Sequence, residues 1–186
     1  MDALELHGRA LDLAAKVVAG VRPEQMMSVT PCPDWDVRAV LNHIVGGNRM
    51  FKAFALGEEP PPRGAGIDLV GNDPAGAYTT TAAAARKAWR SDGALERMMT
   101  LPIGTMPGSV VVGMHAFDHY VHAFDIASAT GQLDKLDDEL STIFLEQAKG
   151  IPAAFRGPGK PFGVELTAPA GASIHEQMAA ATGRKI

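Results

Sequence analysis

The chain has 186 residues, of which 46% are hydrophobic, so it is large enough to bury the core of a single domain. Its net charge is -4 and it has no long run of Lys or Arg, which argues against nucleic acid or an anionic membrane as the main partner. Its one cysteine cannot form an internal disulfide, no stretch approaches the roughly 18 apolar residues of a membrane span, and the N-terminus lacks the pattern of a signal peptide, so we expect one cytoplasmic globular domain over residues 1–186.

Apolar residues at helical spacing predict helices over residues 2–21, from about 34 to 57, and over 73–89. The second of these has the clearest start, because two prolines come shortly before Asp34, which we interpret as its N-cap. The segment 57–73 between the second and third helices contains three consecutive prolines and several glycines. We therefore expect a loop there.

Further along the chain, residues 101–108 are too interrupted by Pro and Gly to form a long helix. The pattern then predicts a helix over about 109–130, which a following glycine ends, and another over roughly 135–155. A short extended segment is expected at 162–168, and a capping box starts a last short helix at Ser173. Four long helices with an irregular crossover predict an all-α helix bundle with a short C-terminal extension.

The most informative segment is 115–126, His-Ala-Phe-Asp-His-Tyr-Val-His-Ala-Phe-Asp-Ile, which holds three of the six histidines. Positions three and four apart share one face of a helix, so this segment predicts a continuous polar stripe. Nitrogen and oxygen donors on an otherwise apolar helix are costly to bury unless something satisfies them. A divalent metal ion is the most economical partner. The stripe consists of His115, Asp118, His119, His122 and Asp125.

Asp118 and His122 are four residues apart and can bind one ion from the same side of a helix. His43 interrupts the apolar face of the helix over 34–57, and we expect it to supply a third ligand from there. Two imidazoles and one carboxylate leave an open coordination position, which is typical of catalytic rather than closed structural sites. We expect the remaining members of the stripe to orient these ligands from behind or to move a proton: His115, His119 and Asp125.

Plainer interpretations of the same residues stay open. His43 taken alone could be a satisfied core or boundary histidine, and Asp-x-x-x-His pairs are common on surface helices. The stripe could also be satisfied by hydrogen bonds alone. We expect His7 to lie on an exposed first turn and His175 to face solvent. We interpret Cys32, which lies between two prolines, as part of a structural turn rather than as a nucleophile.

Two segments resemble the motifs of a known family. Residues 30–48, Thr-Pro-Cys-Pro-Asp-Trp-Asp-Val-Arg-Ala-Val-Leu-Asn-His-Ile-Val-Gly-Gly-Asn, resemble the first motif of actinobacterial proteins similar to mycothiol-dependent maleylpyruvate isomerase. Residues 118–131, Asp-x-x-x-His-Ala-Phe-Asp-Ile-Ala-x-Ala-Thr-Gly, resemble the second. These proteins belong to the wider DinB-like superfamily of metal-dependent thiol transferases. The resemblance covers most of residues 1–155 and points to a subgroup of uncharacterised single-domain members.

The resemblance implies a DinB-like four-helix bundle that binds a divalent metal ion through His43, Asp118 and His122. We expect Zn²⁺, with Ni²⁺ or Fe²⁺ as alternatives. The resemblance also implies a low-molecular-weight thiol such as mycothiol, which the metal activates as a thiolate. The isomerase has Glu at the position of Asp118 and carries an extra C-terminal domain, so we do not carry over the isomerisation itself.

The expected function is therefore a metal-dependent thiol S-transferase that acts on a small electrophile. Hydrolysis by a metal-bound water is the alternative enzymatic activity, and a non-catalytic metal-binding module is the alternative that is not an enzyme. We expect the loop at 57–73 to border the pocket and to select the electrophile, although a plain connector explains its composition as well. The assembly is left open, with a homodimer among the options.

Overall fold

A computed structural model describes residues 1–62, 66–101 and 103–186 of the chain. Over these residues the protein is mostly helical, which confirms the expected all-α class. The helices are α1 (Ala3–Ala19), α2 (Val37–Leu56), α3 (Pro74–Trp89), α4 (Gly108–Thr130), α5 (Asp138–Lys149) and α6 (Ile174–Ala181). A short antiparallel hairpin of β1 (Met98–Leu101) and β2 (Gly104–Pro107) lies between α3 and α4, where the sequence argued against a long helix.

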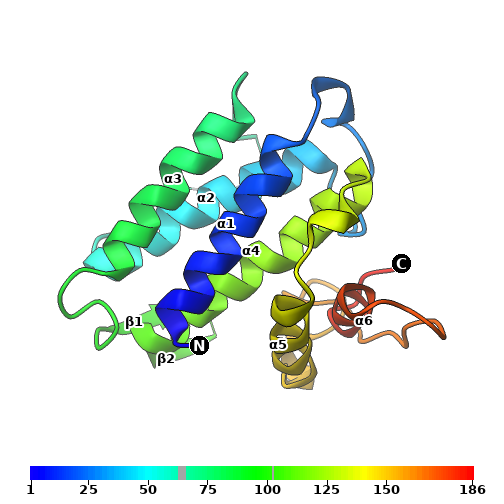
Figure 1. The fold of residues 1–186 in the computed structure, drawn as a ribbon. Coiled ribbons are helices and arrows are strands. Elements are labelled where there is room, and N and C mark those ends of the chain that lie inside the picture. Colours follow the sequence, from blue (N-terminus) through cyan, green and yellow to red (C-terminus); the bar gives the residue numbers. More distant parts are fainter. Residues whose placement is uncertain (63–65, 102) are drawn as a thin grey trace.

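Helices α1 to α4 form the bundle (Figure 1). Both α1 and α2 pack against α3 and against α4, so the four helices form one bundle. Helices α5 and α6 pack against each other beside the bundle, and α6 also contacts α4. One cluster of buried side chains includes residues of the bundle and of this C-terminal pair. None of the described helices is long and apolar enough to cross a membrane.

The start of α2 differs from the expected one by two residues. The side chain of Asp36, rather than Asp34, caps the helix, because its Oδ1 accepts a hydrogen bond from the backbone N–H of Ala39 at 2.8 Å. Asp34 instead has a φ of 66°, in the left-handed region, and belongs to the turn before the helix. Either aspartate fits the sequence pattern of a helix N-cap, so only the backbone conformation shows which of them caps α2.

The C-terminal third also departs from the expected boundaries. The helix predicted over 135–155 is shorter: it begins after Asp137, whose side chain accepts from the N–H of Leu140, and it ends at Gly150. Residues 162–168 form no β-strand in the described part of the chain: Phe162 makes an isolated β-bridge with Arg156, and the N–H of Leu166 donates to a carbonyl of α6. The capping box at Ser173 is confirmed.

Gly108, the first residue of α4, packs closely against the backbone of Ala94, and this contact can be tested. A Cβ atom on Gly108 would lie 2.0 Å from the backbone oxygen of Ala94, whereas one on Gly113 would meet nothing within 4 Å. We expect Gly108→Ala to lower the free energy of unfolding by about 1–3 kcal/mol. Gly113→Ala, the matched control on the same helix, should raise it by about 0.5–1 kcal/mol. Urea denaturation measures both, and equal stabilities of the two variants would contradict the described contact at Gly108.

Candidate metal centre

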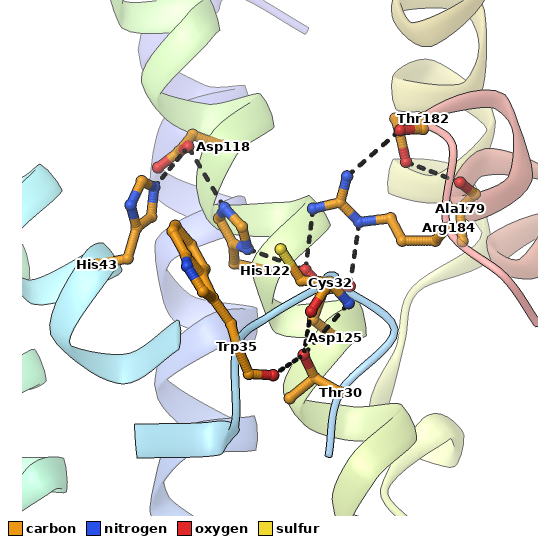
Figure 2. A network of polar contacts seen from close by, with 10 residues as sticks. All are labelled: Thr30, Cys32, Trp35, His43, Asp118, His122, Asp125, Ala179, Thr182 and Arg184. Carbon is orange, nitrogen blue, oxygen red and sulfur yellow. Dashed lines mark hydrogen bonds and ion pairs between the residues drawn. The ribbon is translucent and has the colours of Figure 1, made fainter. Parts of the chain in front are cut away.

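The structure brings the three predicted ligands together between two helices (Figure 2). His43 extends from α2, while Asp118 and His122 lie one turn apart on α4. Nε2 of His43 lies 3.2 Å from Oδ1 of Asp118, and Nε2 of His122 lies 3.7 Å from the same oxygen. One ligand atom from each residue lies within 4.8 Å of the other two. A single ion can therefore be reached by all three.

The donor set fits a divalent metal ion. Two imidazole nitrogens and one carboxylate oxygen suit zinc, and the same set also binds iron(II) or nickel. The side chains of His43 and Asp118 are 21% and 28% exposed, so one side of the cluster is open to a ligand from solvent. Three protein ligands and an open side are typical of catalytic sites.

The charges in this cluster are those that metal binding requires. Burial alone would raise the pKa of Asp118, but the imidazoles of His43, His122 and His119 hold that pKa well below its usual range. The carboxylate is therefore ionised at neutral pH. Burial lowers the pKa of His122, although its hydrogen bond with Asp125 acts in the opposite direction. The neutral imidazole keeps a lone pair for a metal ion.

A buried ion pair lies directly behind His122 (Figure 2). Oδ2 of Asp125 lies 2.9 Å from Nδ1 of His122. Arg184 donates to both oxygens of Asp125, from Nε to Oδ1 at 3.0 Å and from Nη2 to Oδ2 at 2.9 Å. Asp125 is fully buried, which would raise its pKa, but Arg184 and His122 lower it, so the carboxylate stays ionised. Sequence reasoning named Asp125 but missed Arg184, which stands outside every recognised motif.

The turn before α2 covers the cluster on one side. The ring of Trp35 lies 4.7 Å from that of His43 and 5.6 Å from that of His122, between centroids. Thr30 fixes this turn, because its hydroxyl donates to the carbonyl of Trp35 at 2.8 Å and accepts from the N–H of Cys32 at 3.2 Å. Trp35 therefore supplies an aromatic wall beside two candidate ligands.

Cys32 lies close enough to His122 and Asp125 to form a second candidate group of ligands. Both oxygens of Asp125 are, however, taken by the guanidinium of Arg184. Burial also raises the pKa of Cys32 to about 11, so the thiol is protonated at neutral pH. These observations favour the structural interpretation of Cys32 over a nucleophilic one.

His115 belongs to a separate buried network rather than to the three candidate ligands. Its Nδ1 accepts from Nε1 of Trp89 and lies 3.0 Å from Nε2 of His7. An indole N–H can only donate, so this Nδ1 carries no proton and His7 must also donate to it. Nε2 of His115 then donates to Oδ1 of Asn48 at 3.1 Å. The expectation that His7 is exposed is wrong, because its side chain is fully buried between helices.

His119 lies between this network and the candidate metal centre. Its Nδ1 is 2.9 Å from the hydroxyl of Tyr78, and its Nε2 is buried with no hydrogen-bond partner among the described residues. A Cβ on Gly47 would lie 3.8 Å from that Nε2 and 3.6 Å from Oδ2 of Asp118. Nε2 of His119 therefore lies near the same part of α2, at Gly47, as the carboxylate of Asp118.

The side chain of His175, which we expected to face solvent, is only 16% exposed and lies near Asp138.

The loop at 57–73 is described only in part, since residues 63–65 lie outside the described residues. Its second half is fixed to α2: the N–H of Leu69 donates to Oδ1 of Asn42 at 2.5 Å, and Arg38 pairs with Asp68. Asn42 is the neighbour of His43 along α2. That the loop borders the pocket and selects a substrate stays a prediction.

The architecture is that of an all-α bundle with a His-Asp-His cluster between two of its helices. Residues 7–127 match the family model described as the mycothiol maleylpyruvate isomerase N-terminal domain, and the chain belongs to this family. The family expected from the two sequence motifs is thereby confirmed.

Similar proteins include two curated relatives from Mycobacterium tuberculosis, named uncharacterized proteins MT0763 and Rv0738. Each is 37% identical over 188 residues, and each alignment covers 100% of both chains. Among solved structures, mycothiol-dependent maleylpyruvate isomerase has a TM-score of 0.54 at 16% identity, covering 78% of this chain and 71% of that one. A point mutant of that enzyme has a TM-score of 0.57 at 15% identity, and the match covers 88% of this chain and 74% of the mutant chain. The similarity to these two solved structures shows a shared fold.

The buried network at His7 predicts a loss of stability in acid. Burial and, to a smaller extent, the charges of Arg86 and Arg90 lower the pKa of His7 to about 3. In the unfolded chain a histidine has a pKa of about 6.5, so the unfolded state binds a proton that the folded state excludes. The free energy of unfolding should therefore fall as the pH drops from about 6.5 toward 3, by on the order of a few kcal/mol.

His7→Gln, which keeps a donor to His115 but does not titrate, should show a shallower fall. Urea denaturation at a series of pH values compares the two slopes. Identical slopes would mean that His7 is not held neutral in the folded protein.

Proposed function

We propose that this chain is a divalent-metal-dependent enzyme that transfers a low-molecular-weight thiol to a small electrophile. The observation that carries the proposal is the convergence of His43, Asp118 and His122, whose ligand atoms lie within 4.8 Å of one another. The enzyme after which the family is named depends on mycothiol. Mycothiol is therefore the thiol that we assign to this chain.

In this proposal His43, Asp118 and His122 hold the ion, and the partly exposed side of the cluster receives the thiol. A divalent ion supplies a positive charge that lowers the pKa of a coordinating thiol, so that the thiolate is available near neutral pH. Zn²⁺ is the preferred ion, because two imidazoles and one carboxylate with an open position are a common catalytic zinc site. Ni²⁺ and Fe²⁺ suit the same donors.

The protein's own residues have distinct roles in this scheme. The ionised Asp118 balances part of the charge at the site, and the neutral His122 offers a nitrogen lone pair. Trp35 excludes water from one side and offers an aromatic face to the electrophile. The S–H proton leaves to solvent, and the thiolate sulfur forms the new bond to the electrophilic carbon. With an organic halide, the carbon–halogen bond breaks and halide leaves with its electron pair. With an activated double bond, the π bond opens and the neighbouring carbon takes up a proton. We assign the choice of electrophile to the loop at 57–73, whose second half is fixed to α2 beside His43.

The metal content of ligand variants tests the site. We expect about one divalent ion per chain in the wild type, and a large loss in His122→Ala and Asp118→Ala, since each removes a ligand. Asp118→Glu should keep the ion, because it retains the carboxylate on a side chain one methylene longer. Elemental analysis by mass spectrometry measures this, with His175→Ala as a control outside the cluster. Equal metal content in the wild type and in His122→Ala would contradict the assignment of His122 as a metal ligand.

The activity of the metal-loaded protein separates the thiol transferase from its two alternatives. We expect consumption of a small electrophile, such as an activated double bond or halide, to require both the metal and mycothiol. Mass spectrometry of the product should show the thiol adduct. Consumption that needs the metal but no thiol would indicate hydrolysis. Metal binding without consumption of any electrophile tried would favour a non-catalytic metal-binding module.

A further inference from the structure

The C-terminal tail reaches the back of the candidate metal centre. Arg184 comes after α6, lies 59 residues beyond Asp125 in the sequence, and falls outside the segment 7–127 that matches the family model. Its side chain is 8% exposed, and its planar guanidinium donates to both oxygens of a fully buried carboxylate. Such a bidentate pair fixes orientation as well as charge. The tail is therefore joined directly to the residue behind His122.

The backbone before Arg184 leaves little freedom in where the guanidinium points. Gly183 has a φ of 87°, and a Cβ there would lie 2.5 Å from Cα of Gly163. The N–H groups of Gly183 and Arg184 donate to the carbonyls of Ala180 and Ala179, at the end of α6. A glycine with a left-handed conformation is thus required for the turn that aims Arg184 at Asp125 (Figure 2).

A second arginine anchors this turn to the rest of the extension. Arg156 donates from Nη1 to the carbonyl of Ala181 at 2.7 Å and from Nη2 to the carbonyl of Ala148 at 2.5 Å. It therefore joins the C-terminal ends of α6 and α5, two helices that also pack against each other. The position of Arg184 accordingly depends on the whole C-terminal pair of helices.

The contact with Asp125 determines which ring nitrogen of His122 carries the proton. A guanidinium can only donate, so the oxygens of Asp125 act as acceptors. Oδ2 of Asp125 also faces Nδ1 of His122 at 2.9 Å, and that nitrogen must then carry the proton. In a neutral imidazole with a proton on Nδ1, the other nitrogen has a bare lone pair. That other nitrogen, Nε2, is the one that faces Asp118 and the proposed ion.

We propose that Arg184 is a positioning residue of the metal centre, which acts through Asp125 to fix the tautomer and the orientation of His122. The C-terminal extension is then needed for full metal affinity although it supplies no ligand. Carboxylates behind metal-binding histidines commonly change the affinity 10- to 100-fold, roughly, when they are lost. The inference about affinity rests on the proposed metal site, whereas the inference about the tautomer can be tested without any ion.

The test compares Arg184→Met and Arg184→Lys with the matched control Lys185→Met. Lys185 is the next residue along the chain, and it is exposed. Competition with a chromophoric chelator gives the Kd for Zn²⁺, and long-range ¹H–¹⁵N NMR of the metal-free protein gives the tautomer of His122. We expect the Kd to rise about 10- to 100-fold in Arg184→Met, less in Arg184→Lys, and not in Lys185→Met. The proton of His122 should lie on Nδ1 in the wild type and shift partly to Nε2 in Arg184→Met.

A double-mutant cycle with Asp125→Asn separates positioning from a general loss of stability. If Arg184 acts through Asp125, Arg184→Met should weaken zinc binding little further in the Asp125→Asn background. Additive losses would overturn the proposal, as would a wild-type Kd and an unchanged tautomer in Arg184→Met. Arg184→Lys keeps the buried charge and decides the question should the Met variant not fold. If the wild type binds no zinc but its Nδ1 tautomer is lost in Arg184→Met, the proposed function is refuted and the role of Arg184 in fixing the tautomer of His122 is supported.

Discussion

The burial of the polar stripe on α4 is the constraint on which the rest of the structure depends. This helix packs against α1, α2 and α6, and its imidazoles and carboxylates are mostly buried. Buried polar groups destabilise a fold unless they are paired, so partners for the stripe come from several elements. Helix α1 supplies His7, α2 supplies His43, α3 supplies Tyr78 and the C-terminal tail supplies Arg184. The packing of the bundle is in this sense arranged around the hydrogen bonds of one helix.

The two halves of the stripe are satisfied in different ways. Around His115 the partners are neutral and buried, and both ring nitrogens of His115 are hydrogen-bonded. The indole of Trp89 fixes which nitrogen of His115 carries its proton, while Nδ1 of His7 has no hydrogen-bond partner among the described residues. Around Asp118 the carboxylate is ionised, the side chains of His43 and Asp118 are partly exposed, and the ring nitrogens of His43 and His122 lie 3.2 Å and 3.7 Å from the same carboxylate oxygen. The first half behaves as structure and the second half is suited to binding. His119, with one nitrogen bonded to Tyr78 and the other without a partner among the described residues, marks the boundary between them.

Much of the fold and the candidate site could be predicted from the sequence because both depend on short-range spacing. The period of the apolar residues predicts the bundle helices, and a separation of four residues places Asp118 and His122 on one face. The burial of His7 also had a signal that was not used, since it lies three residues after Leu4 and four before Leu11, on the apolar face of α1. Arg184 had no such signal. Its pairing with Asp125 depends on how the C-terminal helices fold back onto α4, which local spacing does not specify.

The shorter carboxylate at position 118 agrees with the way α2 approaches α4. Asp holds its carboxylate oxygens one methylene nearer to the backbone of its own helix than Glu would. The helix that carries His43 must then lie closer for its imidazole to reach the same point. Gly47, one turn after His43, is where α2 faces Asp118, and a Cβ there would already be in van der Waals contact with Oδ2, at 3.6 Å. A larger side chain at 47 would separate the helices, so the small residue on α2 and the short acid on α4 are parts of the same geometry.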